Sequence, residues 1–216
     1  MKAQTIVTVV ILSFIVVGGP RGYAQGTFRN LGFERPILPL IQDNNLMVPA
    51  SNAIPGWTAY LDSFRLDRVG YNTISLGSPQ ISLEGPGFSE PAFQGSYFVI
   101  LQGGIFGSTV TPSIAQTGMI PQDARSLLFY ANPLSSLQPA FAGQLIPLVQ
   151  VGTGPNYVIL GGDITGFAGQ TGELRFTGNG PLDNIQFSNQ PIPEPGVLTL
   201  LSVGAFLFIS RFRRRD

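Results

Sequence analysis

Glycine and proline are spread along this chain rather than gathered in one segment. The 216 residues include 27 Gly and 18 Pro. Inside a helix, Gly is less stable than Ala by about 1 kcal/mol and Pro by about 3 kcal/mol. No stretch between residues 25 and 190 keeps an apolar period of 3.6 residues without such a break. The sequence therefore predicts short strands and at most short helices.

Short apolar runs recur between these breaks, bounded by Gly, Pro, Asn and Ser, and such runs predict strands. Residues 96–102 (SYFVILQ) are apolar nearly throughout, as in a central strand covered on both faces, whereas residues 173–177 (ELRFT) alternate, as in a half-exposed strand. The predicted fold class is all-β, a jelly-roll β-sandwich. The clearest runs are 80–83, 96–102, 113–117, 126–131, 145–151, 157–160, 173–177 and 182–188.

The composition excludes several classes of function. The chain has neither Cys nor His, which excludes disulfides, thiolate catalysis, a Ser-His-Asp triad and His- or Cys-ligated zinc. Between residues 25 and 192 there are six Arg and no Lys against ten Asp and Glu, so this part carries about four net negative charges. An acidic body lacks the basic surface that binds nucleic acid, and we predict no nucleic-acid partner.

The N-terminus has the three-part layout of a secretory signal peptide. Lys2 is followed by an apolar stretch over residues 6–17 and by Gly22 and Ala24, a small-x-small cleavage site. A helix of this apolar length extends roughly 18 Å, which is too short to span the bilayer core. We predict a signal peptide over residues 1–24, cleaved after Ala24; the alternative is a retained anchor.

The C-terminus has the layout of a stop-transfer segment. Residues 196–210 carry no charge, and an arginine-rich tail, residues 211–216, follows them. The basic end is expected to stay in the cytoplasm, which leaves the body outside. As a helix this segment extends roughly 22 Å, less than the ~30 Å bilayer core, so it is a marginal transmembrane helix. The arginines that hold it are Arg211, Arg213, Arg214 and Arg215.

Pro193, Glu194 and Pro195 stand directly before this span. A Pro-Glu-Pro tripeptide, a hydrophobic span and an Arg-rich end at the extreme C-terminus resemble the PEP-CTERM sorting signal. The resemblance implies recognition by a membrane-embedded exosortase and cleavage near the tripeptide. The protein would be held in the inner membrane by its C-terminal helix and then released to the cell envelope, the outer surface or an extracellular matrix. The predicted regions are a signal peptide (1–24), a β-sandwich body (25–190) and a sorting signal (191–216); the alternative for the last is an ordinary tail anchor.

The order of motifs in the body carries a second resemblance. An Asn-x-Gly-Phe-Glu run at residues 30–34, Pro-Gly-Trp at 55–57 and Leu-Asp-Asn-Ile at 182–185 are similar to galactose-binding-like jelly rolls, which include many carbohydrate-binding modules. The resemblance implies that Glu34 and Asp183 are candidate ligands of a structural calcium ion; apart from this candidate ion, no cofactor is predicted. The alternative is that Glu34 caps an edge strand and that Asp183 holds a turn.

Two further interpretations concern ligands. Trp57, the single Trp, would either stack on a sugar ring or lie in the sandwich core. A pair of carboxylates would suffice for a glycosidase, and the acidic residues available for it are Glu84, Glu90, Asp123, Asp163 and Glu173. Neither pattern selects ligand-binding residues.

We therefore expect a non-enzymatic, exported envelope or matrix protein that is sorted by an exosortase and associates with exopolysaccharide. No catalytic residue is predicted. The alternatives are a structural surface protein without a specific ligand and a carboxylate-based carbohydrate-active hydrolase.

Overall fold

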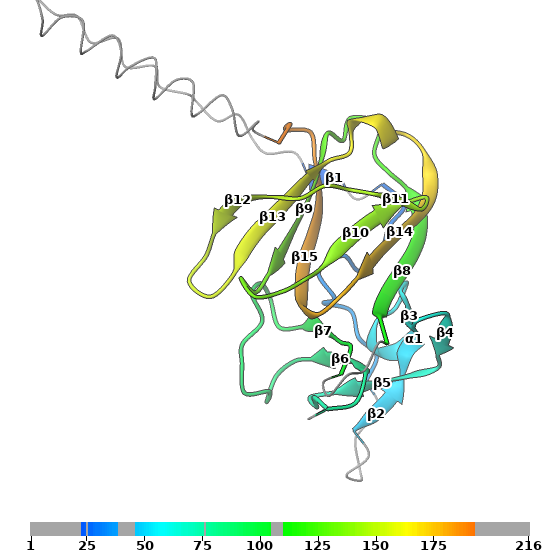
Figure 1. Ribbon diagram of the computed structural model, residues 1–216, viewed down its shortest axis with the longest axis vertical. Helices are drawn as coiled ribbons and strands as arrows, with labels where there is room; N and C mark the ends of the chain where they lie inside the picture. Colours follow the sequence, from blue (N-terminus) through cyan, green and yellow to red (C-terminus); the bar gives the residue numbers. More distant parts are fainter. Residues whose placement is uncertain (1–22, 25, 39–45, 76, 105–109, 193–216) are drawn as a thin grey trace, which may run out of the picture.

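Strands form nearly all the regular structure of this protein (Figure 1). The computed structural model describes residues 23–24, 26–38, 46–75, 77–104 and 110–192. In this part the helical structure is limited to α1 (Ala50–Ala53) and a 3-10 turn, η1 (Thr165–Phe167). The predicted all-β fold class is confirmed.

The larger sheet has nine strands in the described ranges. Eight of them follow the order β12-β13-β9-β15-β7-β6-β5-β2, and β1 pairs with β15 beside this path. All neighbours are antiparallel except β5 and β6, which are parallel. The strands are β1 (Tyr23–Ala24), β2 (Met47–Pro49), β5 (Arg68–Tyr71), β6 (Gln80–Glu84), β7 (Phe98–Gln102), β9 (Ser126–Ala131), β12 (Val149–Thr153), β13 (Val158–Asp163) and β15 (Gly180–Ser188).

The smaller sheet has six described strands in the order β11-β10-β14-β8-β3-β4, all antiparallel. They are β3 (Thr58–Leu61), β4 (Phe64–Leu66), β8 (Pro112–Met119), β10 (Gln138–Phe141), β11 (Gln144–Leu145) and β14 (Thr171–Thr177). The two sheets pack face to face, and aromatic rings meet between them. Phe129 on β9 and Phe176 on β14 lie edge to face with ring centroids 5.1 Å apart. Trp57, just before β3, packs against Phe176 and Phe33.

The predicted strands hold with one exception. Residues 145–151 do not form one strand, because the chain leaves the smaller sheet after β11 and enters the larger one at β12, with Pro147 between them. Ala142 and Gly143 form the turn of the β10–β11 hairpin, with φ angles of 49° and 79°. A turn with both central residues at positive φ matches the twist of a hairpin. Strands β1 to β5 and β10 were not predicted.

Several predicted features lie outside the described residues: Gly22 of the cleavage site, the sorting motif, the span at 196–210 and the tail arginines. Ala24 lies in β1, where its backbone pairs with Phe187. In the described ranges, no helix is long and apolar enough to cross a membrane.

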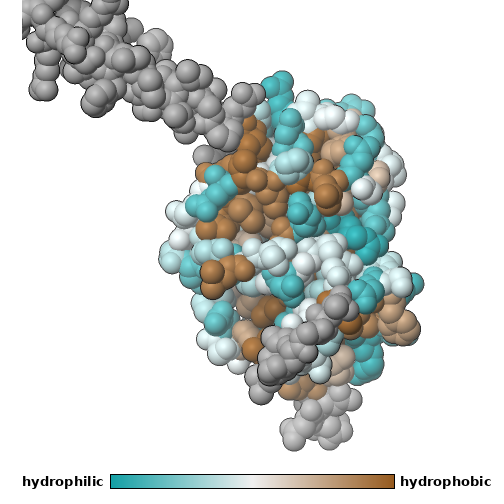
Figure 2. Space-filling model, in the orientation of Figure 1, coloured by the Kyte–Doolittle hydropathy of each residue, from teal (hydrophilic) through white to brown (hydrophobic). Residues whose placement is uncertain are grey.

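Figure 2 shows one face of the molecule, on which apolar residues gather in the region of β9, β10 and β13. The exposed apolar side chains near this edge of the sandwich include Leu145 on β11 and Val151 on β12.

Candidate functional site

The candidate site lies where β15 changes its neighbour. On one side β15 pairs with β9 along most of its length. On the other side β7 pairs only with residues 180–182, the carbonyl of Leu31 accepts a hydrogen bond from the N–H of Ile185 (3.0 Å), and β1 pairs with residues 187–188. The register against β9 shifts between Asp183 and Gln186, and Asn184 has a φ of 48°. This bulge opens the strand to the loops that surround it.

The turn at residues 30–34 approaches the bulge in a constrained conformation. Asn30 and Phe33 have φ angles of 53° and 59°, which is uncommon for residues other than Gly. Packing enforces this conformation, because Phe33 is fully buried and the indole N–H of Trp57 donates to the Asn30 carbonyl (3.1 Å). With Asn184, three left-handed residues therefore surround one site. Backbone strain of this kind gathers at functional sites.

Asp183 is the buried acid of the site, with no exposed surface. Its Oδ2 accepts from the backbone N–H of Gln94 (2.8 Å) and its Oδ1 from that of Asn184 (2.6 Å). Burial raises the pKa of Asp183 to about 7; these hydrogen bonds oppose the rise, and the negative charge of Glu34 adds to it. Glu34 and Asp183 therefore lie close enough for their charges to interact.

Glu34 holds the other part of the loop that precedes β7. Its Oε1 accepts from the backbone N–H groups of Ser96 (2.9 Å) and Tyr97 (3.0 Å). Between them Gly95 has a φ of 70°, and a Cβ there would lie 2.2 Å from the same carboxylate oxygen, so only Gly fits. The two carboxylates thus anchor the loop at residues 93–97. This role differs from the edge-strand cap that was the alternative for Glu34.

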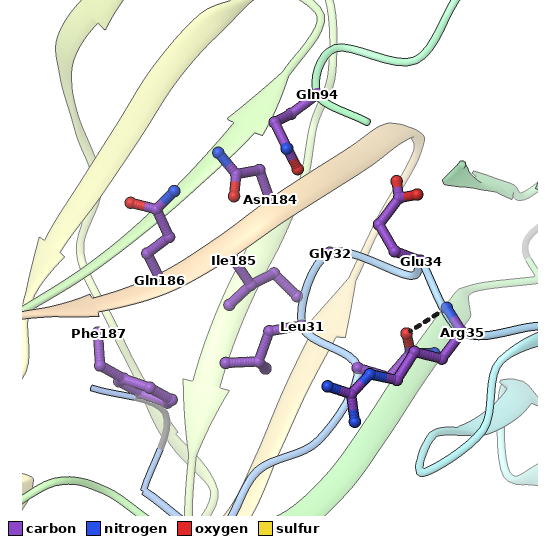
Figure 3. A pocket seen from close by; sticks show the side chains of 10 residues that line it. Leu31, Gly32, Glu34, Arg35, Gln94, Asn184, Ile185, Gln186 and Phe187 are labelled. Carbon is purple, nitrogen blue, oxygen red and sulfur yellow. Dashed lines mark hydrogen bonds between the residues drawn. The ribbon is translucent and has the colours of Figure 1, made fainter. Parts of the chain in front are cut away.

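A cavity of about 330 Å³ opens beside these groups (Figure 3). Figure 3 shows the Glu34 carboxylate on the side of Gln94 and the Arg35 guanidinium on the opposite side, near Leu31. The pocket therefore has an acidic end and a basic end. Its lining residues are Asn30, Leu31, Gly32, Glu34, Arg35, Gln94, Asn184, Ile185, Gln186 and Phe187.

The carboxylates of this site can hold a hard cation only if backbone carbonyl oxygens serve as further ligands. Among the described residues, no group of three or more acidic side chains could hold a metal ion. Among the described residues, the ion pair joins Arg175 and Glu173 on β14. Neither Glu34 nor Asp183 therefore has a cationic side chain as partner. Two neighbouring carboxylates without a counter-charge fit a calcium ion, since calcium binds carboxylate and backbone carbonyl oxygens.

The structure places the other candidate residues elsewhere. Trp57 is 4% exposed and lies in the core, so it offers no stacking surface. Of the five acidic residues considered for a carboxylate pair, only Glu84 is buried, and it lies at the end of β6.

Sequence reasoning missed Gln94 and Arg35 as pocket residues. No local sequence pattern identifies Gln94 as a pocket residue, because its position depends on how the loop folds back on β15. Arg35 directly follows the motif at residues 30–34 and was within reach of the sequence.

Neither the protein-family models nor the curated proteins include a match to this chain. Several solved structures are similar, and three of them each have a TM-score of 0.49. One is a cyclase from Fischerella sp. TAU, at 12% identity over 80% of this chain and 100% of that chain. The second is the Stig cyclase Fisc from Fischerella sp. TAU in complex with (3Z)-3-(1-methyl-2-pyrrolidinylidene)-3H-indole, at 13% identity and the same coverage. The third is a cyclase from Fischerella sp. TAU in complex with 4-(1H-indol-3-yl)butan-2-one, at 13% identity over 79% of this chain and 100% of that chain.

This comparison contradicts the expected function. We predicted a non-enzymatic matrix protein associated with exopolysaccharide, whereas the similar structures are cyclases, two of them with a small indole compound bound. That prediction is withdrawn. At this identity and TM-score the likeness assigns neither an activity nor a ligand to the present chain.

Proposed function

We propose that this chain is an exported β-sandwich protein, of the galactose-binding-like jelly-roll type, that binds a structural calcium ion through Glu34 and Asp183. The observation that carries the proposal is the buried carboxylate of Asp183, whose neighbour is a second carboxylate and not a cation. Burying a charge without a counter-charge is unfavourable by several kcal/mol, and a divalent cation removes that penalty.

Each residue has a defined part in this proposal. Asp183 would supply an oxygen that accepts one N–H bond and keeps a second lone pair. Glu34 would supply Oε2, because the N–H groups of Ser96 and Tyr97 both donate to its Oε1. Backbone carbonyls near the two residues would complete the shell, since calcium takes six to eight oxygen ligands. The bound ion would neutralise both carboxylates and so fasten the loop at residues 93–97 to β15. No reaction step is assigned to the ion.

The test is calcium-dependent stability of the full-length chain in detergent. Saturating calcium should raise the midpoint of thermal unfolding above that in a chelator, since an ion at about 100 times its Kd adds roughly 2.7 kcal/mol. Asp183→Asn should abolish this rise, whereas Asp123→Asn, at an exposed loop position, should retain it. Equal midpoints for the parent protein in calcium and in chelator would exclude the proposal.

The same site predicts how calcium binding depends on pH. The pKa of Asp183 is raised to about 7, so its carboxyl group is increasingly protonated below that pH. Because the ion binds the ionised carboxylate, its affinity should fall as the pH is lowered from about 8 to about 6. Isothermal titration of calcium at these pH values measures the change, and a constant affinity would contradict the role of Asp183.

We further propose that the protein is exported through a cleaved signal peptide and that an exosortase processes its C-terminus. The support is the sequence alone: Pro193, Glu194 and Pro195, the uncharged span and the arginines that follow it. Intact mass of the protein from the envelope fraction should show loss of residues 1–24 and of the sequence after the tripeptide. Unchanged localisation after deletion of residues 193–216 would refute sorting by this signal.

A further inference from the structure

The outer face of strands β9, β13 and β12 is apolar. Successive residues of a strand point to opposite faces, so Leu128 points away from the core, which Leu127 and Phe129 enter. Cross-strand pairing extends this face onto β13 and β12, because Gly161 pairs with both Leu128 and Val149. The side chains of this surface, here named the outer patch, are each at least partly exposed and belong to Leu128, Tyr130, Val149, Val151, Tyr157 and Ile159.

The described part of the chain ends on the outer patch. A Cβ built at Gly161 would lie 2.6 Å from Cδ1 of Ile192, 2.8 Å from Cδ2 of Leu128 and 3.3 Å from Cγ1 of Val151. Three apolar side chains from different segments therefore meet over this glycine. Because Ile192 is the last residue that the structure describes, the chain leaves the sandwich across this face.

The outer patch is also uncharged. Residues 126–162, which include all of its side chains, contain no Asp, Glu, Lys or Arg. The charged residues beside it are Arg125 and Asp163 at the end where β9 and β13 pair, and the buried Asp183, which is paired with Tyr130. Contiguous exposed apolar surface is typical of contacts with a membrane or with another protein. An ion-paired partner has no counter-charge within this patch.

The position of Ile192 favours the membrane over a protein partner. The uncharged span at residues 196–210 begins four residues after Ile192, and four residues extend at most about 14 Å. When that span is inserted, the outer patch is therefore within this distance of the bilayer. The patch also carries two tyrosines, Tyr130 and Tyr157, which stack with ring centroids 4.4 Å apart. Tyrosine is enriched at membrane–water interfaces, because its ring is apolar and its hydroxyl is polar.

We propose that the outer patch lies against the lipid bilayer while the protein is held by its C-terminal span. Its apolar side chains contact the interface, and the smaller sheet, on the opposite side of the sandwich, faces the water. This inference rests on the proposed anchoring by residues 196–210, since the span brings the patch to the membrane. It does not depend on the calcium site, which uses other residues.

The absence of Cys makes the contact measurable, because a single introduced Cys can carry a nitroxide spin label. Full-length protein with Val151→Cys or Thr117→Cys is reconstituted in phosphatidylcholine nanodiscs. EPR then compares the accessibility of each label to oxygen, which concentrates in lipid, and to a nickel chelate, which stays in water. Thr117 is the matched control, because it is an exposed strand residue on the outer face of the smaller sheet.

The label at position 151 should be reached more readily by oxygen than by the chelate, and the label at position 117 more readily by the chelate. Ile159→Asp places a charge on the patch and should shift the label at position 151 toward the chelate, whereas Thr171→Asp, exposed on β14, should not. A label at position 151 that keeps its preference for oxygen in Ile159→Asp would contradict an apolar contact.

Elution of the protein with the nanodiscs separates this proposal from the proposed anchor. Protein that elutes apart from the discs would refute both. Protein that elutes with them while the label at position 151 behaves as the label at position 117 would refute the membrane contact and leave the anchor intact. A label at position 151 that neither reagent reaches would show that a protein surface, such as a second copy, covers the patch, and would also overturn the proposal.

Discussion

Glu84 makes a prediction that can be worked out in numbers. It is the last residue of β6, directly opposite Phe98 on β7, and its side chain has no exposed surface. Its Oε1 accepts from the hydroxyl of Ser82 (2.5 Å), whereas Oε2 is buried without a partner among the described residues. Burial raises the pKa of Glu84 from 4.5 to about 7, and the hydrogen bonds from Ser82 and the Thr73 backbone oppose the rise.

The sign of the effect on stability follows from this pKa. A carboxyl group whose pKa is raised on folding contributes stability that is fully present below the unfolded value and is lost as the pH rises through the folded value. For Glu84 this window runs from 4.5 to about 7. At 1.36 kcal/mol per pKa unit, ionisation of Glu84 lowers the free energy of unfolding by roughly 3 kcal/mol at about pH 8.

Glu84→Gln removes the charge and keeps the shape of the side chain. At about pH 8 the variant should be more stable than the parent protein by up to about 3 kcal/mol, and at about pH 4.5 the two should be nearly equal. Urea unfolding followed by the fluorescence of Trp57 measures both values. Asp183 also titrates near pH 7, but it is present in both proteins and cancels in the comparison.

The matched control is Glu90→Gln in the exposed loop after β6, which should change stability little at either pH. A difference between Glu84→Gln and the parent protein that is the same at both pH values would refute the reasoning. A variant with a lower free energy of unfolding than the parent at about pH 8 would also refute the reasoning, because the buried amide would then destabilise the protein more than the buried charge does.

Two backbone positions give predictions of opposite sign, both measured as the midpoint of urea unfolding. Gly118→Ala places a Cβ 2.8 Å from the buried Phe28 ring and should destabilise the protein by about 1–3 kcal/mol through overpacking; an unchanged midpoint would show that the ring moves freely. Ala142→Gly relieves a left-handed residue in the exposed β10–β11 turn and should stabilise by up to about 1 kcal/mol, and a loss of stability would contradict the assigned strain.

Much of the fold could be read from local patterns. A strand that is buried on both faces, such as β7, needs apolar residues throughout, and one that is half buried, such as β14, needs alternation; both show these patterns of burial. The break at residues 145–151 was harder to predict, because the two parts of this run belong to different sheets. The local sequence does not indicate which sheet a strand joins. The short strands β2 to β5 were missed because their runs of apolar residues are brief.

The candidate site shows the same division. The motifs at residues 30–34 and 182–185 singled out Glu34 and Asp183, and the fold brings both to the loop that precedes β7. The sequence did not distinguish Glu84 from four other acidic residues, because only packing decides which carboxylate is buried.

From the sequence alone came the all-β class, most strand positions and the two acids of the proposed calcium site, because residue type and spacing act over a few neighbours. The tertiary structure decided which strands share a sheet, which charges are buried and which ends of the pocket are acidic and basic. These properties depend on groups far apart in the chain. Asp183 and Gln94, for example, are in contact only because β15 stops pairing with β7 after residue 182 and meets the loop that precedes β7.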